Sequence, residues 1–118
     1  MTQGDVRPFE AVAAEADLDV YTSAGMRTKL RRAVDEGARM LVADLTATTY
    51  LDSSGLAVLV GGLKYARQRG CRFGIACSRE TLLRVIRVSG LLKIFDVRSS
   101  VADFAEEGVA DDADEGGQ

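Results

Sequence analysis

Two adjacent serines, Ser53 and Ser54, are the residues of this sequence best placed for chemistry. They lie in "LDSSGL", between Asp52 and Gly55, where a polar loop gives way to a long apolar run. This pattern predicts a helix N-terminus, where backbone N–H groups lack partners within the helix. A serine hydroxyl there is a common cap. The same N–H groups and the helix dipole also suit a phosphoryl group, so the pair is either a plain cap or a modification site.

Acyl-transfer chemistry is not expected from these serines. The sequence has no histidine, which excludes Ser-His-Asp and Cys-His systems and most zinc sites. The motif "DSSG" also lacks the G-x-S-x-G frame of a nucleophile elbow, and the chain has no Walker-type glycine loop. A small enzyme that uses Ser53 with Asp52 or Asp44 is the remaining alternative, although a base is missing. We therefore expect no enzymatic activity, no metal site and no cofactor.

The composition predicts one cytoplasmic domain. The chain has 118 residues, 47% of them hydrophobic, which is enough for one core. Its apolar runs are shorter than the roughly 18 residues of a membrane helix, and "MTQGDVRPFE" does not resemble a secretory signal. Cys71 and Cys77 lie about 20 Å apart if they share one strand, too far to pair, as suits a reducing compartment.

The charge distribution argues against direct binding of nucleic acid. The formal net charge is -3, but four acidic residues lie within the last eight positions, and the other 14 face 15 basic residues. This balance lacks the concentrated basic stripe that nucleic acids require. We expect one domain over residues 1–108, followed by an acidic, disordered tail over residues 109–118.

Strands and helices alternate along the rest of the chain. Two apolar runs, residues 40–45 and 71–77, predict buried parallel strands. The helix between them, near residues 55–69, has its apolar stripe at Leu56, Leu59, Val60 and Leu63 and ends at Gly70. Gly61 and Gly62, inside that helix, predict close packing against the sheet. Strand, helix and strand form a right-handed crossover, so the fold class is α/β with a mostly parallel sheet.

Three further helices are expected around this unit. One follows Thr22 or Ser23 as its cap and ends at Gly37, with Arg27, Arg31 and Arg32 as a solvated face. A second is capped by Ser78 and stops at Gly90, and a short strand, "LLKIFDV", comes next. Ser99 or Ser100 opens the last helix, which runs to Gly108. The segment "FEAVAAEADLDV" holds one or two strands, with Pro8 favouring an edge, or some helix.

Three segments together resemble a known family. They are "ADLDVYTSAGMRTKLRRAV", "LTATTYLDSSGLAVLVGGLKYARQRG" and "LLRVIRVSGLLKIF", in this order and spacing. They resemble the anti-sigma factor antagonists of the STAS domain family over about residues 16–105. The most specific part is "LDSSGL", supported by the separate segment "SGLLKIF". The resemblance implies a single STAS-like domain whose helices pack against the central sheet.

The resemblance also implies a switch that works through partners. Family members are phosphorylated on the first serine of D-S-[ST]-G by an anti-sigma factor that is also a serine kinase, which makes Ser53 the phosphoacceptor. The unmodified protein binds this kinase and frees the sigma factor, and a phosphoserine phosphatase resets it. The family turn G-E-[LI]-D matches Ala16 to Asp19, with Ala16 in place of glycine and Asp17 in place of glutamate. The implied partner-binding residues are Asp17, Asp19, Asp52, Ser54 as a neighbouring cap, Gly55 for close approach, and Leu56.

A second hypothesis keeps the fold and changes the role. The chain can be a STAS regulatory module of a larger signalling assembly, or a sensor of a small ligand. The intact "DSSG" motif favours control by a kinase. Recovery of a sigma-regulating kinase in a pull-down supports the first hypothesis, and recovery of a sensor scaffold supports the second.

Overall fold

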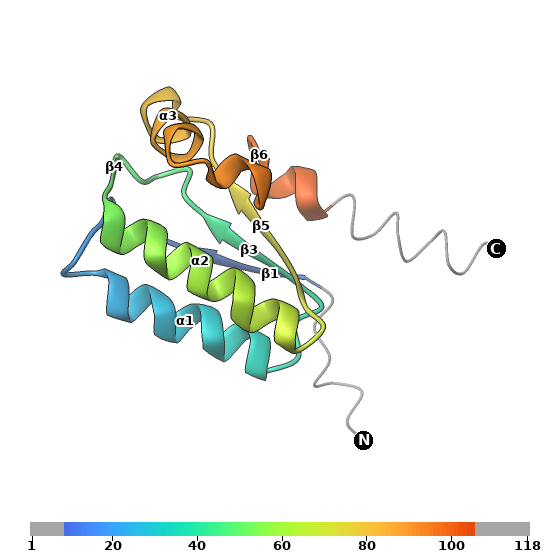
Figure 1. The fold of residues 1–118 in the computed structure, drawn as a ribbon. Coiled ribbons are helices and arrows are strands. Elements are labelled where there is room, and N and C mark those ends of the chain that lie inside the picture. The colour runs from blue at the N-terminus through green and yellow to red at the C-terminus, as the bar shows by residue number, and fades with distance from the viewer. Residues whose placement is uncertain (1–8, 106–118) are drawn as a thin grey trace, which may run out of the picture.

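The computed structural model describes residues 9–105, which form an α/β domain with two layers of helix around a parallel sheet (Figure 1). In chain order the elements are β1 (Glu10–Ala13), β2 (Asp17–Leu18), α1 (Ser23–Asp35), β3 (Met40–Asp44), β4 (Tyr50–Leu51), α2 (Ser53–Gln68), β5 (Arg72–Ala76), α3 (Glu80–Val88), a 3-10 turn (Leu91–Lys93), β6 (Asp96–Arg98) and helical residues 101–105.

The sheet topology confirms the predicted fold class. Four strands lie in the order β1-β3-β5-β6, and every neighbouring pair is parallel. A separate parallel pair joins β2 to β4, with Asp17 opposite Tyr50 and Leu18 opposite Leu51. The segment before α1 therefore holds two strands, and β1 lies at an edge of the sheet as Pro8 suggested.

The core has two sides because side chains alternate along the strands. Leu41 and Ala43 of β3 join the main cluster under α1 and α2, whereas Met40 and Val42 face the opposite side. Phe104 covers that opposite side. Gly74 makes room for it, because a Cβ at this position would overlap the Phe104 ring.

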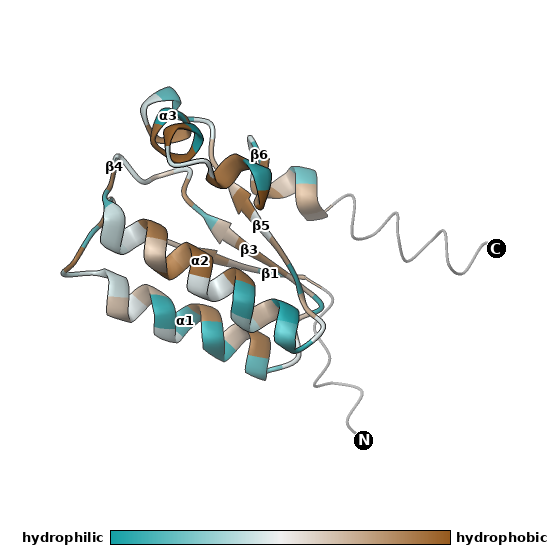
Figure 2. Cartoon of the chain, in the orientation of Figure 1, coloured by the Kyte–Doolittle hydropathy of each residue, from teal (hydrophilic) through white to brown (hydrophobic). Residues whose placement is uncertain are grey.

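The helices α1 and α2 lie side by side in front of β1 and β3, and hydrophilic residues gather on their outward surfaces (Figure 2). The predicted apolar face of α1 is confirmed, because Met26, Leu30, Ala33 and Val34 are all buried. In α2 the buried stripe is rotated slightly from the predicted one, because Val58 and Leu59 are buried whereas Val60 is half-buried.

Several local predictions were wrong. Ser78 is exposed and lies outside α3, whose N-cap is Arg79 without a side-chain bond. The segment "LLKIFDV" begins as a 3-10 turn, because the N–H groups of Ile94 and Phe95 both bond the Leu91 carbonyl, and its strand is Asp96–Arg98. The predicted helix end at Gly108 and the tail over residues 109–118 lie outside the described residues.

No helix within residues 9–105 combines the length and the apolar character that crossing a bilayer requires.

Both cysteines are buried and free, one at each end of β5, which confirms that they do not pair. Burial raises the pKa of the Cys71 and Cys77 thiols, so both stay protonated near neutral pH.

The buried thiols give the first testable prediction. A protonated, inaccessible thiol reacts slowly because the thiolate is the nucleophile. We expect Cys71 and Cys77 to react with a disulfide reagent at pH 8 much more slowly in the native protein than in urea. The reaction is followed by absorbance, with free cysteine as control. Rapid reaction of the native protein would contradict this burial.

Candidate functional site

The N-terminus of α2 is capped by an aspartate rather than by either serine. Asp52 occupies the N-cap in an extended conformation, and its Oδ1 accepts hydrogen bonds from the N–H groups of Ser54 at 2.9 Å and Gly55 at 3.1 Å. The predicted capping role of Ser53 and Ser54 is therefore wrong. Asp52 is the N-cap rather than a serine because its carboxylate accepts hydrogen bonds from both N–H groups and interacts favourably with the positive end of the helix dipole.

This cap leaves the Ser53 hydroxyl available. Ser53 is the first residue of α2 and its side chain is exposed, whereas Ser54 is half-buried. Within residues 9–105 the Ser53 hydroxyl makes no hydrogen bond of the kind that fixes a structural serine. The Ser53 side chain is therefore the more accessible of the two to solvent.

The strands β2 and β4 bring two distant segments to this helix end. The paired residues Leu18 and Leu51 are buried in the core, whereas the preceding pair, Asp17 and Tyr50, is exposed. The backbone N–H of Asp52 also donates to the Leu18 carbonyl at 3.4 Å. The structure therefore places Asp17 beside the segment that leads into Ser53.

Gly55 makes this arrangement possible, although it lies away from the molecular surface. It is buried, and a Cβ added to it would lie 2.5 Å from the Leu18 carbonyl oxygen and 2.6 Å from Cδ1 of Leu51. The predicted close approach at Gly55 is thus one between α2 and β2 of the same chain. Leu56 is half-buried and packs against the core, so only part of its side chain is available to a partner.

The carboxylate of Asp19 organises the turn that precedes α1. Its Oδ1 accepts hydrogen bonds from the N–H groups of Tyr21 at 2.9 Å and Thr22 at 3.1 Å. The Thr22 hydroxyl donates to the Asp17 carbonyl at 2.7 Å and makes no capping bond to α1. Asp19 is half-buried and Asp17 is exposed, so Asp17 is the more accessible charge.

Ala16 fits where the family motif has glycine. Its carbonyl accepts hydrogen bonds from the backbone N–H groups of Thr49 at 2.7 Å and Tyr50 at 3.2 Å. Positive φ angles within residues 9–105 occur only at glycines, so Ala16 has an ordinary backbone conformation. The substitution is tolerated here because the turn does not require a left-handed residue.

The carboxylates of Asp44 and Asp52 serve as local hydrogen-bond acceptors. Asp44 Oδ1 accepts from the backbone N–H and the hydroxyl of Thr46, at 3.0 and 2.6 Å, and Asp52 caps α2. Among the described residues, neither carboxylate forms a hydrogen bond to the Ser53 hydroxyl that would activate it. Within residues 9–105, His, Cys, Asp and Glu side chains form no group of three that could hold a metal ion.

Exposed apolar side chains border the site and were missed by sequence reasoning. Val20 is 62% exposed, Tyr21 90% and Tyr50 51%. Tyr21 also lines a hollow of about 240 Å³ beside α1. The available signal was alternation in β4, where buried Leu51 forces its neighbour Tyr50 outward. Exposed tyrosines around a polar centre are typical of protein-binding surfaces.

With this geometry in place, the STAS domain family profile matches residues 8–104. The chain belongs to the STAS domain family. A curated relative, the anti-sigma-B factor antagonist of Bacillus subtilis strain 168, is 32% identical over 81 residues, which cover 69% of this chain and 73% of the relative. Relatives of this STAS protein from Listeria monocytogenes and Listeria innocua, each 33% identical over 84 residues, carry the same name, anti-sigma-B factor antagonist.

Solved structures support the same fold. A putative anti-sigma factor antagonist from Thermotoga maritima superposes with a TM-score of 0.72 at 20% identity, covering 82% of this chain and 86% of that one. The phosphorylated form of the Bacillus cell fate determinant SpoIIAA gives a TM-score of 0.62 at 16% identity, over 81% and 87% of the two chains. At these identities the likeness concerns the fold, which confirms the STAS assignment.

The Gly55 contact predicts opposite effects for two substitutions in α2. Gly55→Ala places a methyl group against the Leu18 backbone and should destabilise the protein by about 1–3 kcal/mol. The control is Gly61→Ala, because Gly61 is exposed and has open space around it, contrary to its predicted packing role. That substitution should stabilise by about 0.5–1 kcal/mol. Gly62, which faces Leu30 and Phe73, does pack as predicted.

Urea unfolding followed by circular dichroism measures both changes. The contrast tests the placement of the helix, because the two glycines share the same secondary structure and differ in their tertiary contacts. Equal stability changes for Gly55→Ala and Gly61→Ala would contradict the close approach of α2 to β2.

Proposed function

We propose that this STAS domain is an anti-sigma factor antagonist switched by phosphorylation of Ser53. The observation that carries the proposal is the exposed Ser53 hydroxyl, released from capping because Asp52 accepts the helix N–H groups. The anti-sigma factor antagonist relatives support the same role. The protein acts by binding and has no turnover of its own.

In the unmodified state the surface around Ser53 binds an anti-sigma factor that is also a serine kinase. This surface comprises Asp17, Tyr21, Tyr50 and the exposed start of α2. Binding occupies the anti-sigma factor and frees the sigma factor. Asp52, Ser54 and Gly55 contribute by fixing the helix end, and Asp19 contributes by fixing the turn that carries Tyr21.

Phosphorylation reverses this binding through charge. The Ser53 Oγ attacks the γ-phosphorus of ATP held by the kinase, the bond to ADP breaks, and a base of the kinase takes the hydroxyl proton. The product adds about -1.5 to -2 charges at pH 7. The dipole of α2 favours this charge, whereas the Asp52 carboxylate at the N-cap repels it. A phosphatase restores the hydroxyl by hydrolysis.

The added charge acts on the interface more than on the fold. Ser53 is exposed, so its phosphate remains solvated in the free protein, whereas the complex must desolvate it or place it beside Asp17. Such burial can weaken binding by several kcal/mol, and about 1.4 kcal/mol is a tenfold change in affinity. The switch therefore needs no rearrangement of the core.

Matched serine variants test the site of modification. After incubation with its serine kinase and ATP, Ser53→Ala should remain unmodified and keep its affinity for the kinase, whereas Ser54→Ala should gain one phosphate. Intact mass and peptide mapping measure the outcome. A fully phosphorylated Ser53→Ala protein would place the acceptor elsewhere. Phosphorylated wild type should bind the kinase at least about tenfold more weakly than the unmodified protein.

The exposed tyrosines should act as binding anchors. We expect Tyr50→Ala to weaken the complex by about 2 kcal/mol, as central aromatic residues of interfaces often do. Its own stability should change by less than about 0.5 kcal/mol, because Tyr50 is largely exposed. Val88→Ala is the control, since Val88 is also an apolar, exposed side chain but lies on α3. Titration calorimetry with the anti-sigma factor measures both, and unchanged affinity for Tyr50→Ala contradicts this surface.

A further inference from the structure

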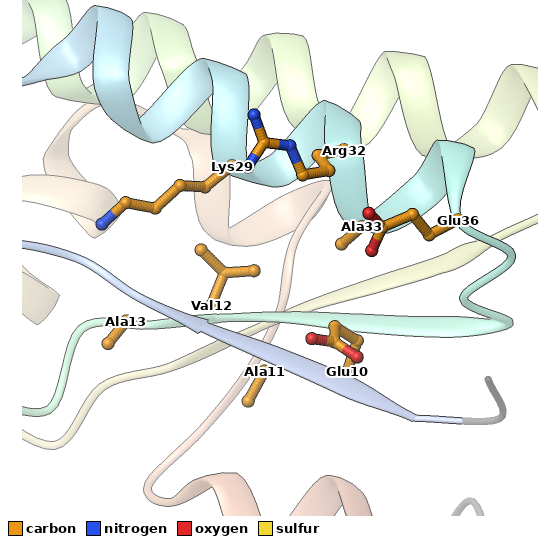
Figure 3. Close-up of a pocket in the computed structure, with 8 residues that line it drawn as sticks. All are labelled: Glu10, Ala11, Val12, Ala13, Lys29, Arg32, Ala33 and Glu36. Carbon is orange, nitrogen blue, oxygen red and sulfur yellow. The ribbon is translucent and has the colours of Figure 1, made fainter.

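A groove of about 330 Å³ runs between β1 and α1, along the edge of the four-stranded sheet. Val12 points from β1 toward the helix, and Ala33 faces it from α1 (Figure 3). The middle of the groove is therefore apolar, and charged side chains lie toward its two ends.

The outer side of β1 is suited to pairing with another strand. Within residues 9–105 no strand lies beyond it. The Ala14 N–H donates to the Asp44 carbonyl, so by alternation the N–H and C=O groups of Ala11 and Ala13 point away from β3. Their side chains are small, and β1 has none of the lysines, prolines or bulges that commonly protect an edge strand. Another backbone can therefore approach this edge closely.

The charges along the groove change sign from one end to the other. Lys29 lies at the Ala13 end, whereas Glu10 and Glu36 lie at the opposite end (Figure 3). Arg32 lies between them, one helical turn before Glu36. With two cations and two carboxylates the groove is neutral as a whole, but it has one cationic end and one acidic end.

We propose that two copies of this chain associate by antiparallel pairing of their β1 strands about a two-fold axis at Val12. In this register Ala11 of each copy lies opposite Ala13 of the other, and each such pair exchanges both N–H···O=C hydrogen bonds through its outward groups. Val12 lies opposite Val12 of the second copy in a non-hydrogen-bonded pair, with Cα atoms about 4.5 Å apart. The two sheets become continuous, and the Val12 side chains meet where the two grooves join.

The charge pattern favours a second copy because it complements itself. The two-fold axis reverses the strand direction and places the cationic end of each groove against the acidic end of the other, so Lys29 faces Glu36 of the second copy. Glu10 and Glu36 each already make an interaction in their own chain, and a carboxylate can accept a second cation. Arg32 lies nearest the axis, where Glu36 on the same helix offsets its charge. A surface that matches itself on two-fold rotation is what an isologous dimer requires.

This dimer leaves the surface around Ser53 open. Ser53 begins α2, which packs against α1 and β5 and lies away from the outer side of β1 (Figure 1). Antiparallel pairing also directs the two β1 strands in opposite directions, so the two Ser53 residues lie at opposite ends of the assembly. One dimer thus presents two separate Ser53 sites.

Sedimentation velocity of the full chain over a range of concentrations tests the proposal through charge variants. Lys29→Glu places like charges opposite Glu36 of the second copy, and Glu36→Lys does the same opposite Lys29. Each variant alone should raise the dissociation constant of the dimer at least about tenfold. An equimolar mixture of the two should dimerise again, because each altered side chain then faces an opposite charge. Lys64→Glu, the same charge change at an exposed position of α2, is the control and should leave the constant unchanged.

A proline variant tests the strand pairing itself. Ala11→Pro removes an outward N–H and leaves the hydrogen bonds between β1 and β3 in place, so it should abolish the dimer without changing the far-ultraviolet circular dichroism. Ala11→Ser keeps the N–H and should dimerise like the wild type. In the wild type the Ala11 and Ala13 amides, resolved by NMR, should exchange more slowly as protein concentration rises.

The possible results decide the proposal in either direction. A wild-type chain that sediments as a monomer up to about 1 mM overturns it. A dimer that survives both Ala11→Pro and Lys29→Glu also overturns it, because association then uses another surface. Concentration-dependent protection of the Ala11 and Ala13 amides, with recovery of the dimer in the mixture of charge variants, supports it. These measurements use the unphosphorylated protein without a partner, so they are independent of any result at Ser53.

Discussion

The close contact between the first turn of α2 and the backbone of Leu18 is the constraint on which the site depends. Gly55 permits it, because any Cβ there would overlap the Leu18 carbonyl or the Leu51 side chain. The contact holds β2 and β4 against the helix end and fixes Asp17, Tyr50 and Ser53 on neighbouring positions. A larger residue at position 55 would separate the helix from the strand that completes the surface.

A second feature is the division of roles among polar residues at this end of the sheet. Asp52 satisfies the helix N–H groups and Asp19 satisfies those of the turn before α1, so their carboxylates are engaged structurally. Ser53 is thereby left with an exposed, unengaged hydroxyl. Modification at such a position changes the charge of the surface while the hydrogen bonds that hold the helix remain, which suits a reversible binding switch.

Elements with strong local sequence patterns were predicted correctly. Features for which two adjacent residues were equally suitable, such as the N-cap of α2, were not. The strands β3 and β5 and the buried face of α1 follow from apolar runs and helical periodicity. The predicted cap of α2 was wrong because serine and aspartate are both common N-cap residues. Only the backbone geometry shows which side chain accepts the hydrogen bonds from the helix N–H groups. Gly61 and Gly62 look equivalent in sequence, yet only Gly62 faces Leu30 and Phe73.

The sequence by itself determined the α/β alternation, the parallel sheet and the position of "DSSG" at a helix N-terminus, because periodicity and helix-start signals act over a few residues. The tertiary structure decided which serine is accessible, why Gly55 must be glycine, and that exposed tyrosines border the site. These features depend on contacts of β2 with β4 and α2, and β2 lies more than thirty residues before both of them in the sequence. Packing across such separations is set by the whole fold and cannot be inferred from local sequence.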